Sequence, residues 1–165
     1  MDYELMMNGN IKIGQKAPDF IANTTIGEIN MQDYKGKWII IFSLPETFEP
    51  ICSTELLAFE RIYDKIKKLN CELIGINTDS NNAHLVWIYD IFKKTGIKIE
   101  FPIISDINGK IAREYGMITT EKNDFKILRN VIIIDDKGEI RTILEYPLNV
   151  ERSIPEILRI FLAMK

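Results

Sequence analysis

Residues 38–59 read WIIIFSLPETFEPICSTELLAF, and this stretch decides the fold class. Its first five residues are all apolar, which is expected for a strand in the middle of a sheet that is covered on both faces. Its end opens an amphipathic helix over residues 51–69, where apolar side chains recur at three- and four-residue intervals. A buried strand that passes through a short loop into a long helix is typical of α/β proteins.

The alternation of strand and helix patterns continues on both sides of this stretch. A short hairpin is expected over residues 19–31, with its turn near Gly27. Besides the strand at 38–43, strands are expected at 71–77, 101–104, 129–135 and 139–144, and further helices at 81–95, from about 108 and from 153 to 164. This order predicts an α/β fold with a mixed central sheet covered by helices and an N-terminal β-hairpin.

Length and composition indicate one globular domain. The chain has 165 residues, of which 46% are hydrophobic, and this is enough to bury a substantial core. Its 21 basic and 24 acidic residues give a net charge of -3, so we expect neither nucleic acid nor anionic lipid as a partner. The apolar runs are far shorter than the ~20 residues of a bilayer-spanning helix, and the first residues do not resemble a secretion signal, so we expect a cytoplasmic protein without a membrane span.

The cysteines and the single histidine exclude several kinds of site. Two cysteines without an export signal argue against a disulfide framework, and with His84 as the only histidine a zinc site cannot be assembled within one chain. Cys52 and Cys71 lie at opposite ends of the predicted 51–69 helix, roughly 25 Å apart at about 1.5 Å per residue. Because a disulfide needs Cα atoms closer than ~7 Å, no intrachain bridge is expected, and Cys71 is predicted to belong to the core.

Cys52 occupies the junction between strand and helix, in the first helical turn. The partial positive charge of unsatisfied backbone N–H groups favours an anion there, so the reactive thiolate is expected to be stabilised relative to the thiol. The alternative is a buried, inert cysteine, which is the usual state of a free cysteine. The position of Cys52 favours the reactive interpretation.

Several segments together resemble the alkyl hydroperoxide reductase and thiol-specific antioxidant family of peroxiredoxins, which have a thioredoxin-like fold. The matching segments are GQKAPDF at 14–20, YKGKW at 34–38, PICSTE at 50–55, DS at 79–80, HLVW at 84–87, FPIISD at 101–106 and LRNV at 128–131. Any one alone is a weak signal, but their order and spacing match the family. The resemblance implies a single thioredoxin-like domain over residues 13–165, and we expect residues 1–12, which lie outside it, to form a mobile extension.

The resemblance assigns roles to individual residues. Cys52 matches the peroxidatic cysteine, whose thiolate attacks a peroxide oxygen and becomes a sulfenic acid. Arg129 matches the arginine that stabilises thiolate and peroxide, although a surface or interface charge is the alternative. Pro45 matches a loop proline that shields the pocket from water, and Glu55 fits a supporting partner for an arginine. Arg152 matches a second arginine of some members, or else is a solvated charge beside a helix start.

Glu49 departs from the family pattern, which places Thr or Ser three residues before the cysteine. A carboxylate so near a thiolate adds like-charge repulsion and raises the cysteine pKa. A protonated Glu49 could donate a hydrogen bond, an ionised one could pair with Arg129, and Thr47 could take over the missing hydroxyl's role. We therefore expect a thiol-dependent peroxidase that is slower than its relatives.

The family also implies partners for this site. The substrate is expected to be hydrogen peroxide or an organic hydroperoxide, and no metal or other cofactor is expected. No cysteine lies in the C-terminal region where many relatives place a resolving cysteine, so we expect an external thiol or a thioredoxin-like protein to reduce the sulfenic acid. The family commonly forms dimers or larger rings, so a homo-oligomer is expected.

Other functional classes are less well supported. A disulfide oxidoreductase of the Cys-x-x-Cys type needs a second thiol at position 55, which is Glu55. Asp135 and Asp136 are adjacent and lie at a turn, so they are unsuited to act as a catalytic carboxylate pair. The remaining competitor is a redox sensor or binding protein that keeps the fold while Glu49 weakens turnover.

Overall fold

The structure is a computed structural model, and it describes residues 11–121 and 124–165. Most of the predicted N-terminal extension, residues 1–10, lies outside the described residues. The elements follow one another as β1 (Ile21–Thr24), β2 (Gly27–Asn30), the 3-10 helix η1 (Met31–Tyr34), β3 (Trp38–Ser43), α2 (Pro50–Lys67), β4 (Cys71–Asn77), α3 (Asn81–Thr95), β5 (Ile103–Ser105), α4 (Lys110–Glu114), β6 (Ile118–Glu121), β7 (Asp124–Ile127), β8 (Arg129–Ile134), β9 (Ile140–Tyr146) and α5 (Ile154–Met164). None of the described helices is long and apolar enough to cross a membrane.

The central sheet is mixed, as the sequence predicts. Its strands lie in the order β2-β1-β5-β4-β3-β8-β9, with β1 and β2 forming the N-terminal hairpin. β4 runs parallel to β3 and β5, whereas β8 runs antiparallel to β3 and β9. The apolar stretch that opens residues 38–59 is therefore β3, which lies inside the sheet with every residue buried.

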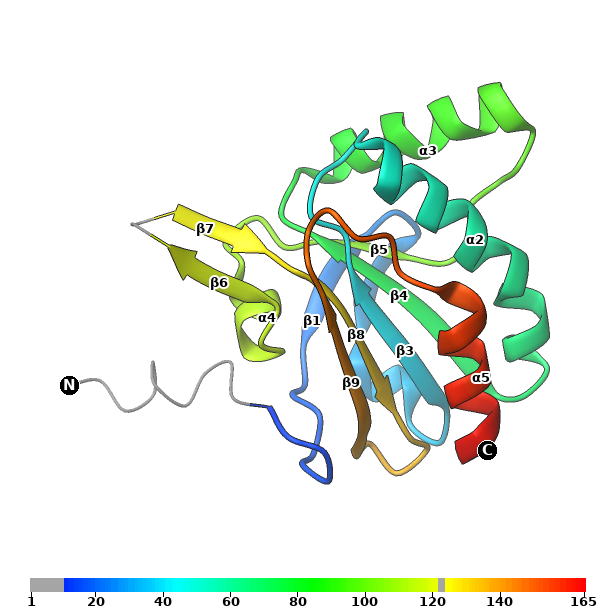
Figure 1. Ribbon diagram of the computed structural model, residues 1–165, viewed down its shortest axis with the longest axis vertical. Coiled ribbons are helices and arrows are strands. Elements are labelled where there is room, and N and C mark those ends of the chain that lie inside the picture. Colours follow the sequence, from blue (N-terminus) through cyan, green and yellow to red (C-terminus); the bar gives the residue numbers. More distant parts are fainter. Residues whose placement is uncertain (1–10, 122–123) are drawn as a thin grey trace.

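Helices cover both faces of the sheet, and successive residues of β3 alternate between two hydrophobic clusters. Trp38, Ile40 and Phe42 join the cluster that contains the buried faces of α2, α3 and α5. Ile39 and Ile41 join the cluster on the other face, to which α4 and the segment before β1 contribute. Figure 1 shows α2, α3 and α5 on one side of the sheet and α4 on the other.

A hairpin and a helix differ from the sequence predictions. β6 and β7 form a separate two-stranded hairpin that was not expected, because its sequence is largely polar and gives no clear strand pattern. α4 is short and begins at Lys110, with Gly109 as its N-cap. The Asp106 carboxylate accepts hydrogen bonds from the backbone N–H groups of Ile111 and Ala112, at 3.3 and 2.8 Å.

Candidate active site around Cys52

Cys52 is the third residue of α2, which confirms its predicted place in the first helical turn. The helix begins at Pro50, where the missing N–H costs no hydrogen bond. Glu49 is the N-cap, and its carboxylate accepts hydrogen bonds from the backbone N–H groups of Ile51 at 3.0 Å and Cys52 at 2.9 Å. The positive end of the helix is therefore complemented by the Glu49 carboxylate instead of by the sulfur.

Strand pairing brings Arg129 to the start of α2. β8 pairs antiparallel with β3, with Val131 opposite Phe42, so the first residue of β8 lies beside the end of β3. The loop from β3 to α2 starts at this same place. Arg129 is 2% exposed, so the alternative of a surface charge is wrong.

The guanidinium of Arg129 contacts both Cys52 and Glu49. Nη1 lies 3.3 Å from the Cys52 sulfur, and Nη2 donates to Glu49 Oε2 at 3.1 Å. Nε donates to the backbone carbonyl of Leu148 at 2.6 Å, which fixes the plane of the guanidinium. Arg129 is thus held in a position from which it can stabilise negative charge at the sulfur.

Glu55 links Arg129 to Arg152. Glu55 Oε1 accepts hydrogen bonds from Arg129 Nη1 at 3.0 Å and from Arg152 Nη2 at 2.9 Å. Oε2 accepts from the backbone N–H and Nε of Arg152, at 2.9 and 2.7 Å. Arg152 also donates to the carbonyl of Asn130 at 2.9 Å. Glu55 and Arg152 are both buried, so the interpretation of Arg152 as a solvated charge is wrong.

Arg129, which contacts the thiol, belongs to a network of two guanidinium groups and two carboxylates whose charges balance when all four are ionised. The ion pairs join Arg129 to Glu49 and Glu55, and Arg152 to Glu55. Glu49 is the most exposed of the four, with 24% of its side chain accessible. Ionisation of Cys52 would add an uncompensated negative charge to this buried group.

The sulfur is less ready to ionise than the sequence predicts. Cys52 is fully buried, and this burial raises the pKa of its thiol. The backbone N–H of Glu46 and the guanidinium of Arg129 act to lower the pKa, whereas the charge of Glu49 raises it further. The expected thiolate is thus disfavoured in this conformation, since the pKa is raised overall.

Glu49 adopts the ionised, arginine-paired arrangement, one of the alternatives open from the sequence. Burial acts to raise the pKa of its carboxyl, but hydrogen bonds from two backbone N–H groups, from Arg129 and from the Cys52 side chain outweigh burial and lower it. Thr47 does not replace the missing hydroxyl, because its own hydroxyl donates to the carboxylate of Asp79.

Hydrogen bonds connect the loop before α2 to β4 and, through β4, to α3. Asn77, the last residue of β4, donates its side-chain N–H to the carbonyl of Leu44 at 2.5 Å. Its side-chain oxygen lies 2.9 Å from Nε2 of His84 on α3. Burial lowers the pKa of His84 to about 4, so the ring is neutral near pH 7 and Nε2 is the donor. Pro45, which follows Leu44, is partly buried in this loop.

Asn77 is a residue of the site that was not predicted from the sequence. The ends of the parallel strands β3 and β4 lie side by side, and a polar residue that ends such a strand is the signal that could have identified it. His84 is completely buried at its contact with Asn77.

Cys71 lies away from this site. It is the first residue of β4, beyond the far end of α2, and it is buried. Burial raises the pKa of its thiol to about 12. Both cysteines are free, as the predicted separation requires.

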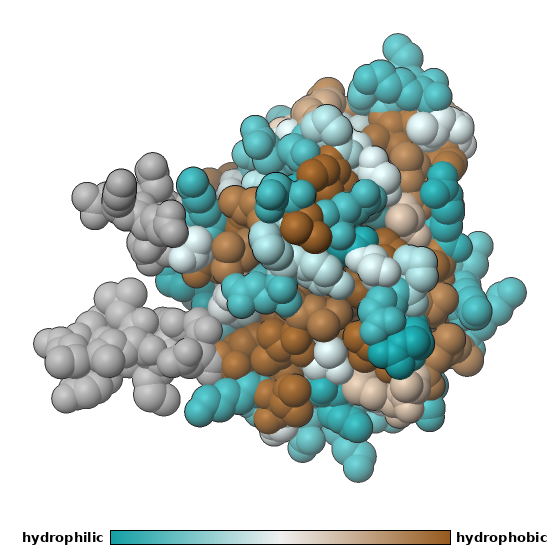
Figure 2. All heavy atoms as spheres, viewed as in Figure 1, coloured by the Kyte–Doolittle hydropathy of each residue, from teal (hydrophilic) through white to brown (hydrophobic). Residues whose placement is uncertain are grey.

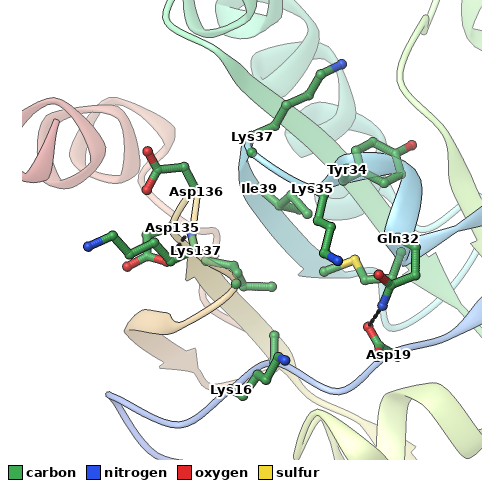
Figure 3. A pocket seen from close by; sticks show the side chains of 15 residues that line it. Lys16, Asp19, Gln32, Tyr34, Lys35, Lys37, Ile39, Asp135, Asp136 and Lys137 are labelled. Carbon is green, nitrogen blue, oxygen red and sulfur yellow. Dashed lines mark hydrogen bonds between the residues drawn. The ribbon is translucent and has the colours of Figure 1, made fainter.

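A hollow of about 370 Å³ lies elsewhere on the protein and does not include Cys52. Its charged lining residues are Lys16, Asp19, Lys35, Lys37, Asp135, Asp136 and Lys137. Figure 3 shows the hydrogen bond of 2.9 Å between Gln32 and Asp19 at its wall. Asp135 accepts from the backbone N–H groups of Lys137 and Glu139, which accounts for it as a turn residue. Within residues 11–121 and 124–165, no three His, Cys, Asp or Glu side chains are grouped as metal ligands.

The chain has relatives among known proteins. The model of the AhpC/TSA family matches residues 13–143. The chain is 47% identical over 154 residues to Peroxiredoxin 2 of Caldanaerobacter subterraneus, covering 93% of this chain and 70% of that protein. It is 48% identical over 149 residues to Peroxiredoxin 2 of Picrophilus torridus, covering 90% of this chain and 73% of the relative.

Two solved structures superpose closely on this chain. A yeast mitochondrial 1-Cys peroxiredoxin superposes with a TM-score of 0.86 at 35% identity, covering 93% of this chain and 76% of the other. The AhpC of Enterococcus faecalis superposes with a TM-score of 0.82 at 27% identity, covering 92% of this chain and 91% of the other. The chain therefore belongs to the AhpC/TSA family of peroxiredoxins and has the thioredoxin-like fold that its sequence predicts.

Proposed function

We propose that the protein is a thiol-dependent peroxidase that reduces hydrogen peroxide or organic hydroperoxides through Cys52. Membership of the peroxiredoxin family supports this activity. The observation that carries the proposal is the approach of Arg129 Nη1 to within 3.3 Å of the Cys52 sulfur.

The reaction needs an ionised sulfur and a donor aimed at the oxygen that leaves. The thiolate of Cys52 attacks one peroxide oxygen, the O–O bond breaks, and water or an alcohol departs while the sulfur becomes a sulfenic acid. The guanidinium of Arg129 stabilises the negative charge on the sulfur and on the departing oxygen. Glu55 and Arg152 hold the guanidinium in place through buried hydrogen bonds.

Access to the sulfur requires a change in the loop before α2. Cys52 is fully buried, whereas Glu49 is partly exposed and Phe48 is 48% exposed. Phe48 also has a φ of 64°, a backbone conformation that is unfavourable for a bulky aromatic residue. Because the sulfur is fully buried, a peroxide can reach it only after neighbouring residues move, and we assign this movement to the loop that holds Phe48 and Glu49.

Glu49 is proposed to make this peroxidase slower than its relatives. Its carboxylate caps the helix and pairs with Arg129, two interactions that a thiolate or peroxide would otherwise use. A slow reaction leaves the alternative of a redox sensor or binding protein, in which Cys52 is oxidised once and is not turned over.

Consumption of hydrogen peroxide by the reduced protein, followed by stopped flow with and without an added thiol, tests the function. A peroxidase consumes many equivalents when a small thiol or a thioredoxin-like protein is supplied, and Cys52→Ser abolishes this. Consumption of a single equivalent that no thiol renews would assign the protein to the sensor class.

The reductant, assembly and location are part of the same proposal. Because Cys71 lies beyond the far end of α2, we assign reduction of the sulfenic acid to an external thiol or a thioredoxin-like partner. We further propose that the protein acts in the cytoplasm as a homo-oligomer, a dimer or larger. The molar mass measured by light scattering tests the assembly.

A further inference from the structure

The surface segments beside the Cys52 site carry negative charge toward solvent. Residues 44–50 before α2 and residues 147–152 between β9 and α5 lie at the same end of the central sheet (Figure 1). The charged side chains of these two segments that reach solvent are the carboxylates of Glu46, Glu49 and Glu151. Arg129 and Arg152 are both buried. A molecule that approaches the site therefore meets carboxylates before it meets a guanidinium.

Glu49 is the carboxylate that shares an arginine with the sulfur. Its Oε2 lies 3.1 Å from Nη2 of Arg129, and Nη1 of the same guanidinium lies 3.3 Å from the sulfur of Cys52. A peroxide oxygen that accepts a hydrogen bond from Arg129 comes within roughly 3 Å of this guanidinium. The rest of the peroxide molecule then lies close to the Glu49 carboxylate.

Glu49 also changes the net charge of the reactive state. The network of Arg129, Arg152, Glu49 and Glu55 is neutral when all four are ionised, and the Cys52 thiolate gives it one net negative charge. The Thr or Ser of the family pattern is uncharged, so with that residue the thiolate would complete a neutral site. Glu49 therefore makes the reactive state repel an anion that it would otherwise not repel.

Resting on the peroxidase function proposed above, we propose that Glu49 is a specificity-determining residue that selects uncharged hydroperoxides over those that carry a carboxylate, a sulfate or another negative group. An anionic hydroperoxide is repelled by the like charge of Glu49, whereas an uncharged one is not. Phe48 and Leu148 are 48% and 37% exposed on the same two segments, and they offer apolar surface for an alkyl group.

Two alkylating reagents of similar size measure this charge effect without a peroxide. Iodoacetamide is uncharged and iodoacetate carries a carboxylate, and both react with the thiolate and release iodide. Because the fraction of thiolate enters both rates equally, the ratio of the iodoacetamide rate to the iodoacetate rate does not depend on the Cys52 pKa. The same ratio for 2-mercaptoethanol corrects for the intrinsic reactivity of the reagents, and mass spectrometry locates the alkylated cysteine.

The corrected ratio should exceed one in the wild type and fall on the order of tenfold in Glu49→Gln, as for like charges roughly 5 Å apart at an effective dielectric constant of about 50. Gln keeps an oxygen for the helix cap but carries no charge. Glu49→Asp keeps the carboxylate and should keep most of the ratio. Glu28→Gln, which removes an exposed carboxylate on the edge strand β2, is the matched control and should leave the ratio unchanged.

Salt provides a second measurement that needs no variant. Raising the ionic strength from about 0.01 M to about 1 M shortens the Debye length from about 30 Å to about 3 Å. The wild-type ratio should fall over this range toward the value of Glu49→Gln, whereas the ratio of Glu49→Gln should change less. A steric effect of Glu49 on access to Cys52 would not depend on ionic strength.

A matched pair of hydroperoxides extends the test to the substrate. Cumene hydroperoxide is uncharged, and the same compound with a para carboxylate is an anion of similar shape near neutral pH. Stopped flow gives the second-order rate of each with the reduced protein. The ratio of the uncharged to the anionic hydroperoxide rate should fall in Glu49→Gln by a factor similar to that of the alkylation ratio.

Equal hydroperoxide ratios in wild type and Glu49→Gln, with peroxide still consumed, would overturn the selection by charge and leave the peroxidase function intact. This holds even if the alkylation ratio changes. If Cys52 of the wild type is alkylated but the protein reduces neither hydroperoxide, the peroxidase function itself fails, and the selection of hydroperoxides fails with it. The two failures are therefore distinguishable.

Discussion

Cys52 contacts Arg129, which is part of a network of two arginines and two glutamates with balanced charges. The N-terminal position of a thiol on a helix predicts a stabilised thiolate, but the carboxylate of Glu49 takes up that stabilisation. Burial raises the pKa of Cys52. The thiol is therefore the resting form. Burial is the main cause of this raised pKa, and the charge of Glu49 raises it further.

The variant Glu49→Thr should react faster with hydrogen peroxide. Removing the carboxylate frees Arg129 and the backbone N–H of Cys52, and it removes a like charge that raises the cysteine pKa. The second-order rate is measured by stopped flow at pH 7, with Glu151→Thr as a control in the exposed segment before α5. An unchanged or lower rate for Glu49→Thr speaks against an inhibitory effect of Glu49.

At the scale of elements, the site joins the start of α2, the start of β8 and the segment before α5. Glu55 on α2 connects these three segments, because it forms ion pairs with both Arg129 and Arg152. Both arginines are buried, so neither can exchange its partner for water. The same contacts therefore serve the site and the stability of the fold.

Replacing Glu55 by Gln should destabilise the protein by about 3–5 kcal/mol, since it leaves a buried positive charge without its partner. Urea unfolding followed by circular dichroism gives the free energy of unfolding. Glu151→Gln should change it by less than about 0.5 kcal/mol, as is usual for an exposed side chain. A loss below 1 kcal/mol for Glu55→Gln would mean that the buried arginines are stabilised in another way.

His84 should make stability depend on pH through the contact between α3 and the loop before α2. Its pKa is about 4 in the folded protein because of burial, against about 6.5 in an unfolded chain. Between these values the unfolded chain binds more protons, so the free energy of unfolding falls as the pH decreases, by roughly 3 kcal/mol for this group. In His84→Gln this part of the pH dependence should be absent in urea unfolding at pH 7 and pH 4.5. Equal slopes in both proteins would show that His84 titrates normally.

The sequence predicts the bounds of an element well where its apolar pattern and the residues that flank it indicate the same element. The bounds of β4 and α3 match the expected ranges, because a buried strand and a helix between Ser80 and Gly96 have clear patterns. The β6–β7 hairpin is missed because its polar sequence has no strand periodicity. In the site, Cys52 and Arg129 follow from the family segments. The pairing of Glu55 with Arg152 could not be derived, since it joins residues 97 positions apart and depends on how α2 and α5 pack.

At the scale of the whole molecule, the arrangement of the two cysteines determines how the protein can be reduced. Peroxide treatment should produce no disulfide between Cys52 and Cys71, because α2 separates them. Cys71→Ala should retain turnover with an external thiol, measured by peroxide consumption. A dimer on a non-reducing gel that disappears in Cys71→Ala would instead assign a resolving role to Cys71.

We propose two surfaces for the homo-oligomer, one at the edge of the sheet and one on α3. β9 is an edge strand, and Figure 2 shows hydrophobic side chains on the face of the molecule where the lower ends of β1 and β9 lie. Leu85, Tyr89 and Phe92 form an exposed apolar row on α3. The proposed homo-oligomer should have a molar mass of at least twice 19.2 kDa by light scattering. A mass of one chain at micromolar concentration would contradict the proposed oligomer.

The most direct test of the central claim, that Arg129 assists peroxide cleavage at Cys52, is the rate of sulfenic acid formation in wild type and Arg129→Lys. Trapping the sulfenic acid with dimedone and mass spectrometry locates the oxidised cysteine. We predict modification at Cys52, with a rate that falls on the order of a hundredfold or more in Arg129→Lys, because a donor to the developing charge is misplaced. Equal rates in the two proteins, or oxidation at Cys71 in place of Cys52, would contradict the account.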